Sequence, residues 1–307
     1  MISILPSSSI AMGRPVRIPV PHSLRKAIPS SDLAEAALAN AIQGVGIPCL
    51  DLTRLSRVLM GCEGHAVLAA PRCWTDAQLR WAYVVLLHHL GEINGHYGKL
   101  FDLQERGVDE TPLGSLVSGA KARTAMRTDS SDAQYNPDLV AFLCLQPGTS
   151  EGRMMLANAP AMLGRLRQTR PELEPVARMA WPCHMDATNL ESEEKATTNN
   201  AIPMFSEDAS GFVFRYTRSK TERAMVKLGQ RVPADLMRLF DFIDADMEAH
   251  AIRFELYRGE MLFVNNRETA HGRESIDCGP GIDHRCLVRS WVDGFLDSHA
   301  PALSRRA

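Results

Sequence analysis

Three side chains in this sequence have the types and spacing that could support chemistry: Arg127, Asp129 and His271. Arg127 and Asp129 are two residues apart, and residues with this spacing point to the same side of an extended strand. The carboxylate of Asp129 and the imidazole of His271 are groups that bind transition metals or transfer protons. The guanidinium of Arg127 stays protonated at ordinary pH and has no lone pair for a metal. The three residues therefore indicate either an incomplete metal site or an electrostatic and acid-base site.

The segments around these residues resemble a known family. A strand-like run, PDLVAFLCL at 137–145, follows Asp129, and the run RGEMLFVNNR at 258–267 precedes His271. Over roughly residues 98–292 this pattern resembles the iron(II)- and 2-oxoglutarate-dependent oxygenases of the TauD/TfdA and clavaminate synthase-like superfamily. Their usual motif is His-X-Asp or His-X-Glu followed by a distant His. Here Arg127-Thr128-Asp129 stands in place of His-X-Asp, and His271 follows Arg127 by 144 residues (271 minus 127).

The resemblance implies that Asp129 and His271 are the two remaining iron ligands. A guanidinium about 4 Å from a divalent ion would oppose its binding by on the order of 8 kcal/mol at an effective dielectric near 20. This repulsion is comparable with a micromolar binding free energy. We therefore expect Arg127 to pair with Asp129 on the same strand face. A second candidate pair, His184-Met185-Asp186, has the His-X-Asp spacing but lacks the strand that follows the motif in the family.

The resemblance also assigns residues to the co-substrate and the substrate. Arg285, which lies 14 residues after His271 (285 minus 271), matches the arginine that holds the far carboxylate of 2-oxoglutarate. Met154 occupies the position of a family threonine that assists the co-substrate. Arg289 stands where related enzymes contact an acidic substrate group, and Arg215 lies in a segment that the family places near the pocket. Ordinary surface ion pairs are the alternative interpretation of these arginines.

Apolar spacing and turn residues predict the elements that position these side chains. Strands are expected at 65–69, 139–145, 154–157, 212–216, 252–256, 261–264 and 286–291, and helices at 33–44, 76–90, 159–167 and 234–250. Short strands around a few helices, without regular βαβ alternation, favour an α+β protein with a mostly β core. The expected architecture is a double-stranded β-helix, or jelly roll, flanked by helices, which the resemblance also implies.

Length and composition bound the domain organisation. The 307 residues, 45% of them hydrophobic, can bury a sizeable core. We expect an extended N-terminal lead-in at 1–30 and one oxygenase-like domain at 31–307. Seven cysteines without CxxC spacing indicate no disulfide framework and favour a cytoplasmic location. The net charge of -2 and the lack of a long apolar run argue against nucleic-acid and membrane partners.

Three functions remain open at this point. The first is a small-molecule oxidoreductase of the superfamily with an atypical or lost iron site, acting on an amino-acid-like or carboxylate metabolite. Its cofactors, Fe(II) and 2-oxoglutarate, are implied by the resemblance. The second is a metal-independent enzyme that uses Arg127, Asp129, His271 and Arg285 for electrostatic and acid-base work. The third is a non-catalytic homologue that binds a small molecule. The sequence does not indicate an oligomeric state.

Overall fold

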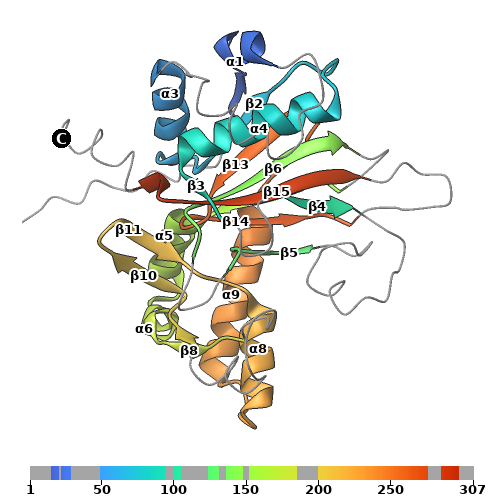
Figure 1. The fold of residues 1–307 in the computed structure, drawn as a ribbon. Coiled ribbons are helices and arrows are strands. Elements are labelled where there is room, and N and C mark those ends of the chain that lie inside the picture. The colour runs from blue at the N-terminus through green and yellow to red at the C-terminus, as the bar shows by residue number, and fades with distance from the viewer. Residues whose placement is uncertain are drawn as a thin grey trace, which may run out of the picture.

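Two β-sheets that pack against each other form the centre of the protein (Figure 1). The structure is a computed structural model, and it describes residues 15–20, 22–28, 49–94, 100–104, 124–130, 136–147, 152–184, 200–275 and 285–296. The larger sheet has the strand order β1 (Arg17–Pro19), β2 (His65–Ala69), β13 (Glu260–Asn265), β6 (Leu139–Gln146), β15 (Cys286–Asp293) and β3 (Glu92–Ile93), and β4 (Phe101–Gln104) also pairs with β15. The smaller sheet has the order β12 (Ile252–Phe254), β7 (Met154–Asn158), β14 (Thr269–Arg273) and β5 (Thr124–Arg127). Two short pairs, β8 (Trp181–Pro182) with β9 (Ala201–Ile202) and β10 (Phe205–Asp208) with β11 (Gly211–Phe214), lie outside these sheets.

The side chains of β6 explain why this strand reads as an unbroken apolar run. They alternate between two buried clusters, with Leu139, Ala141, Leu143 and Leu145 on the face toward the helices and Val140, Phe142 and Cys144 on the face toward the smaller sheet. A strand that is covered on both faces has no polar side, so it loses the alternation of a half-exposed strand. The cluster between the two sheets also contains Met154 and Leu156 of β7. The cavity described below opens beside this cluster.

Helices cover the outer faces of both sheets (Figure 1). On the larger sheet lie α3 (Cys49–Leu59) and α4 (Asp76–Leu90), with α1 (His22–Ala27) nearby. On the smaller sheet lie α5 (Ala159–Thr169), the short turn η1 (Pro171–Leu173), α6 (Glu174–Arg178) and α9 (Ala234–His250), with α8 (Arg218–Lys227) beside α9. Thr75 and Gln78 form a reciprocal capping box that fixes the start of α4, because each side chain accepts a hydrogen bond from the backbone of the other.

The predicted jelly roll with flanking helices is confirmed, and several elements keep their predicted bounds. The strand at 65–69 and the helices at 76–90 and 234–250 coincide with β2, α4 and α9. The strand expected at 212–216 ends at Phe214, because the backbone N–H of Arg215 turns to the carbonyl of Met204 in a different segment. Helices α1, α3, α6 and α8 are not predicted from the sequence. The helix expected at 33–44 lies outside the described residues.

The N-terminal segment takes part in the fold. Strand β1 pairs in parallel with β2, and α1 follows it, so part of the expected extended lead-in is helical. The division between 1–30 and 31–307 remains a prediction. Within the described residues, no helix has the length and apolar character that crossing a membrane requires. The cytoplasmic location also remains a prediction.

Candidate functional site

Strands β5 and β14 bring Arg127 and His271 together, although the two residues are far apart in the sequence. The strands are antiparallel, and Arg127 lies directly opposite His271 in their register. Gly272 allows this close approach, because a Cβ atom at that position would lie 2.8 Å from the carbonyl oxygen of Thr124 and 2.9 Å from Cγ of Met126. The pairing therefore depends on a residue without a side chain next to His271.

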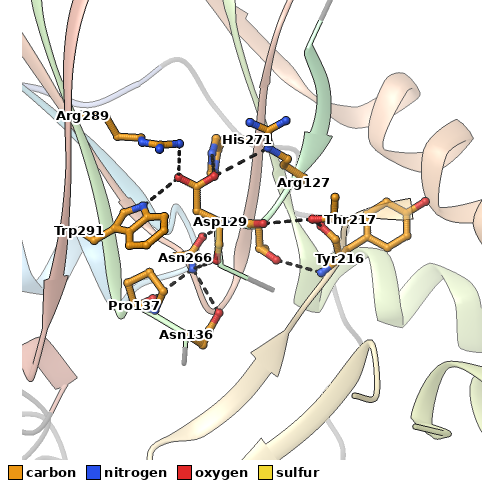
Figure 2. Close-up of polar contacts among 11 residues, drawn as sticks. Arg127, Asp129, Asn136, Pro137, Tyr216, Thr217, Asn266, His271, Arg289 and Trp291 are labelled. Carbon is orange, nitrogen blue, oxygen red and sulfur yellow. Dashed lines mark hydrogen bonds and ion pairs between the residues drawn. The ribbon is translucent and has the colours of Figure 1, made fainter. Parts of the chain in front are cut away.

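The carboxylate of Asp129 is the centre of the site (Figure 2). Its Oδ1 atom lies 3.4 Å from Nε2 of His271 and 3.8 Å from Nε of Arg127. Its Oδ2 atom accepts hydrogen bonds from Nη1 of Arg289 at 3.1 Å and from Nε1 of Trp291 at 2.9 Å. The side chain of Asp129 is only 4% exposed. One buried anion thus faces two guanidiniums, an indole N–H and an imidazole.

The charges around Asp129 determine its protonation. Burial alone would raise the pKa of this carboxyl group, because the ionised form loses hydration. The guanidiniums of Arg289 and Arg127 and the contact with His271 outweigh burial and hold the pKa of Asp129 well below its usual range. Asp129 is therefore ionised at neutral pH.

A buried asparagine fixes the backbone that carries Asp129 (Figure 2). The Oδ1 atom of Asn266 accepts a hydrogen bond from the backbone N–H of Asp129 at 2.8 Å. The Nδ2 atom of Asn266 donates to the carbonyl oxygens of Asp129 and Pro137 and to the side chain of Asn136. Asn266 is fully buried, so these bonds replace contacts with water. On the other side, the hydroxyl oxygen of Thr128 accepts a hydrogen bond from the backbone of Tyr216.

The two candidate ligands have a spacing that suits a metal. Neighbouring ligands at right angles on an octahedral ion lie about 3 Å apart when each bond is about 2.1 Å long. The 3.4 Å between Asp129 Oδ1 and His271 Nε2 is close to that separation. The ring of His271 packs edge-on against Phe142, with 5.6 Å between the ring centroids. Asp129 and His271 could therefore occupy two adjacent corners of a coordination sphere.

The residue at the position of the third ligand cannot bind a metal. Arg127 lies there, and its guanidinium contributes a positive charge and no lone pair. Across the described parts of the chain, no three His, Cys, Asp or Glu side chains are grouped so that they could hold a metal ion. The donor set of this chain therefore does not fit an iron centre with three protein ligands. Arg127 contacts Asp129 at 3.8 Å, but not on one strand face as the sequence predicts, because β5 ends at Arg127 and Asp129 lies in the turn after it.

A cavity of about 510 Å³, part of it open to solvent, lies beside these residues. We call it the central cavity. Its polar lining is mostly cationic, since it contains Arg127, Arg273, Arg285, Arg289 and His271. Its apolar lining comprises Leu103, Phe142, Met154 and Leu287. A partly apolar cavity with several converging guanidiniums suits a small organic anion.

Arg285 and Met154 meet at one wall of the central cavity. Arg285 is 5% exposed, and its Nη2 atom lies 3.2 Å from the sulfur of Met154. A thioether is a weak hydrogen-bond acceptor, so it satisfies a guanidinium less well than a carboxylate would. The two residues that the sequence assigned to the co-substrate are therefore adjacent in the structure.

Two other candidates lie away from this group. Arg215 lines neither the central cavity nor the second cavity described below. His184 is buried, and its backbone N–H donates to the carbonyl of Lys220. Its proposed partner, Asp186, lies outside the described residues. Neither residue contributes to the arrangement around Asp129 that the structure describes.

Sequence reasoning missed two residues that hold the site. Asn266 belongs to the NNR run that carried the resemblance, but its contact with Asp129 follows only from the folded backbone. Trp291 donates to Asp129 from the end of β15, and it was regarded only as a strand residue. Trp291 and Arg289 are two residues apart in β15, so their shared direction was the available signal.

Comparison with known proteins identifies the family. The model of the taurine catabolism dioxygenase TauD, TfdA family matches residues 74–291, which is more than half of the chain. The chain belongs to this family. A taurine hydroxylase-like protein, SAT17, from Stachybotrys chartarum (strain CBS 109288 / IBT 7711) is 25% identical over 200 residues, which are 62% of this chain and 48% of that protein. The match thus spans about half the length of this curated relative.

Solved structures share the fold at low sequence identity. Asparagine oxygenase in complex with Fe(II), 2S,3S-3-hydroxyasparagine and succinate has a TM-score of 0.65 and 18% identity, and the match covers 90% of this chain and 92% of that one. The non-haem iron oxygenase OrfP in complex with Fe and alpha-ketoglutaric acid has a TM-score of 0.64 and 12% identity, with 91% and 94% covered. These likenesses show the oxygenase fold, and the family match adds the membership.

Proposed function

We propose that this protein is a small-molecule oxidoreductase of the TauD/TfdA family with an atypical iron site, acting on an amino-acid-like or carboxylate metabolite. The observation that carries this proposal is the central cavity, whose lining holds four arginines together with His271, the neighbour of Asp129. The family match spans all the strands that line this cavity. The structural relatives named above were solved with hydroxyasparagine and succinate or with alpha-ketoglutaric acid, which supports a carboxylate ligand here.

Arg285 and Arg289 are the residues that we assign to anionic ligands. Arg285 would hold the far carboxylate of 2-oxoglutarate, and Met154 beside it would contact the aliphatic part of that molecule. Arg289 lies in the cavity wall and already contacts Asp129, so it would bind a substrate carboxylate while keeping its ion pair. We do not include Arg215, because it lines neither cavity.

Asp129 and His271 are the residues that we assign to Fe(II), and Arg127 limits their affinity. Fe(II) with 2-oxoglutarate supplies the oxidising chemistry of this family when it is bound. The chain's own contribution is a buried carboxylate that stays ionised and an imidazole that is held close to it. Arg127 has a side chain that is 29% exposed, so it can turn toward solvent without leaving a buried charge. We therefore expect weak iron binding that requires this side chain to move.

A second candidate function is supported by the contact between Arg127 and Asp129. If the guanidinium stays in place, the cavity remains an anion site without a metal. The protein would then bind a small carboxylate without turnover, or would act on it through the acid-base groups alone. Both outcomes need the same Arg285 and Arg289.

One set of assays separates these functions. Protein loaded anaerobically with excess Fe(II) and then exposed to oxygen and 2-oxoglutarate should release succinate if the first proposal is correct. Calorimetric binding of glutarate without succinate release would favour the non-catalytic binding protein, whereas conversion of a candidate metabolite in the presence of a chelator would favour the metal-independent enzyme.

Two arginine variants test whether glutarate binds in the central cavity. Arg285→Gln should weaken glutarate binding by roughly tenfold or more, because it removes a charged hydrogen bond. Arg167→Gln is the matched control, since Arg167 lies on the surface of α5 and pairs with Glu174. Equal glutarate affinity in both variants, or no glutarate binding by the wild type, would contradict the proposed function.

A further inference from the structure

A second cavity lies on the other side of β5, between this strand and helices α8 and α9. We call it the helical cavity, and its volume is about 1010 Å³, part of it open to solvent. Ala125, Met126 and Met247 form its apolar lining. Its polar lining comes from Arg127, Thr217, Arg218, Glu222, Asp244 and Glu248. It is therefore a separate compartment with mixed chemistry.

The wall formed by α8 and α9 carries surplus negative charge. One guanidinium, Arg218, contacts three carboxylates: Glu222 at 2.8 Å, Asp241 at 2.9 Å and Asp244 at 2.9 Å. Glu222 and Asp244 line the cavity and Asp241 does not, so this part of the wall has a net charge of -1 (one positive charge minus two negative charges). The start of α8 adds about half a positive charge from the helix dipole, which offsets only part of the surplus. Glu248 is neutralised separately, since it pairs with Arg253.

Arg127 separates the two cavities and lines both of them. Figure 2 shows it on the side of Asp129 that faces Thr217 and Tyr216. The central cavity on one side is rich in arginine, and the helical cavity on the other side has an acidic wall. Two adjoining compartments of opposite charge suit a molecule that carries both charges.

We propose that the two cavities form one divided site for a zwitterion, with its carboxylate in the central cavity and its cationic group at Glu222 and Asp244 in the helical cavity. This inference rests on the proposed function, because it assigns the substrate class of the same site. The cationic group would be an ammonium or a guanidinium. Arg127 would contact the carboxylate from the boundary between the cavities, and the apolar lining would contact the carbon chain.

Helix packing alone does not account for the acidic wall. An ion pair that joins α8 to α9 needs only one carboxylate of α9 on Arg218. Asp241 already provides this carboxylate, and it does not line the cavity. Asp244 contacts the same Nη1 atom at the same distance, and it also accepts a hydrogen bond from the hydroxyl of Tyr216 at 2.6 Å. Asp241 and Asp244 thus form a natural pair for comparison, since Asp244 lines the cavity and Asp241 does not.

The first test uses three ligands of matched length on the wild-type protein. Isothermal titration with 6-aminohexanoate, hexanoate and 1-aminohexane compares a zwitterion with molecules that carry only one of its charges. We expect 6-aminohexanoate to bind roughly tenfold more tightly than either of the others, because each end adds a charged contact. Hexanoate binding as tightly as 6-aminohexanoate would overturn the inference.

The second test compares the two aspartates. Asp244→Asn should weaken binding of 6-aminohexanoate by roughly tenfold and leave binding of hexanoate unchanged. Asp241→Asn should leave both affinities unchanged, and thermal unfolding would verify that both variants fold. Equal losses in the two variants would overturn the inference. If Asp244→Asn does not fold, Glu222→Gln takes its place, and the titrations of the wild type still decide.

Glutarate separates this inference from the proposed function. Glutarate needs only the central cavity, so it should bind the wild type and both aspartate variants alike. Glutarate binding without any preference for the zwitterion would overturn the divided site and leave the proposed function standing. A wild type that binds neither glutarate nor hexanoate would overturn both.

Discussion

The backbone that carries Asp129 and the side chains that contact its carboxylate are held differently. Fully buried Asn266 makes hydrogen bonds to the backbone of Asp129 and to the backbone of Pro137. The contacts of Arg127 and His271 with the carboxylate of Asp129 are longer than these hydrogen bonds, at 3.8 Å and 3.4 Å, and the side chain of Arg127 is 29% exposed. The backbone support of Asp129 is buried and uncharged, whereas the side chains around its carboxylate are cationic and partly exposed.

This difference shows that one residue type can change the chemistry of a site without changing its architecture. The register of β5 and β14 and the contacts of Asn266 with Asp129 involve backbone atoms and no atom of the Arg127 side chain. The charge balance does depend on this side chain, because a guanidinium is always charged, whereas an imidazole can lose its proton and offer a lone pair. Variants of Asn266 should therefore change stability, and variants of the side chains around the carboxylate of Asp129 should change binding.

The largest effect on stability is expected from Asn266→Ala. This variant leaves the buried N–H of Asp129 and several carbonyl oxygens without partners, and the free energy of unfolding should fall by about 3 kcal/mol. Urea denaturation would measure it. Asn136→Ala is the matched control, since it removes only one 3.3 Å contact with Asn266 and should change stability by less than about 1 kcal/mol. Equal losses of unfolding free energy in the two variants would contradict this role of Asn266.

A smaller effect that depends on pH is expected from Asp129→Asn. The folded pKa of Asp129 is held low, so its ionised form stabilises the protein above the unfolded pKa of about 3.9, and this stabilisation is lost as the pH falls through the folded value. The variant should lower the free energy of unfolding by about 2 kcal/mol at pH 7, and less at acidic pH. A difference between variant and wild type that stays constant from neutral to strongly acidic pH would contradict the charged cluster.

The smallest effect is expected at Met154, which lines the central cavity beside Arg285. Met154→Thr replaces a thioether with a smaller hydroxyl beside Arg285, and glutarate affinity should rise by about threefold. Met154→Leu is the control, because it keeps an apolar side chain and should leave the affinity unchanged. Calorimetry would measure both, and a loss of affinity in Met154→Thr would contradict this expectation, because the apolar contact of Met154 with the ligand would then outweigh the added hydroxyl.

Much of the fold was predictable because local signals agreed with the final packing. The apolar run of β6 and the capping residues of α4 specify their elements without reference to distant residues. The proximity of Asp129 and His271 was available only from the family resemblance, because no local pattern joins strands that far apart in sequence. The contacts of Asn266 and Trp291 with Asp129 depend on the register between strands, which the sequence does not state.

The helical cavity could not be predicted for a related reason. Its walls combine β5 with α8 and α9, and the spacing of α8 alone did not identify a helix. Glu222, Asp241 and Asp244 have the usual appearance of a solvated helix face in the sequence. Only the folded structure shows that all three surround one guanidinium.

We propose that the charge of Arg127 takes the place of a metal ligand. Anaerobic titration of Fe(II) into the wild type, Arg127→Gln and Arg127→His tests it most directly, since Gln removes the charge and His also restores a nitrogen donor. We predict that Arg127→His binds iron roughly 100-fold more tightly than the wild type, with Arg127→Gln between them. Wild-type protein that binds iron as tightly as Arg127→His would contradict the account.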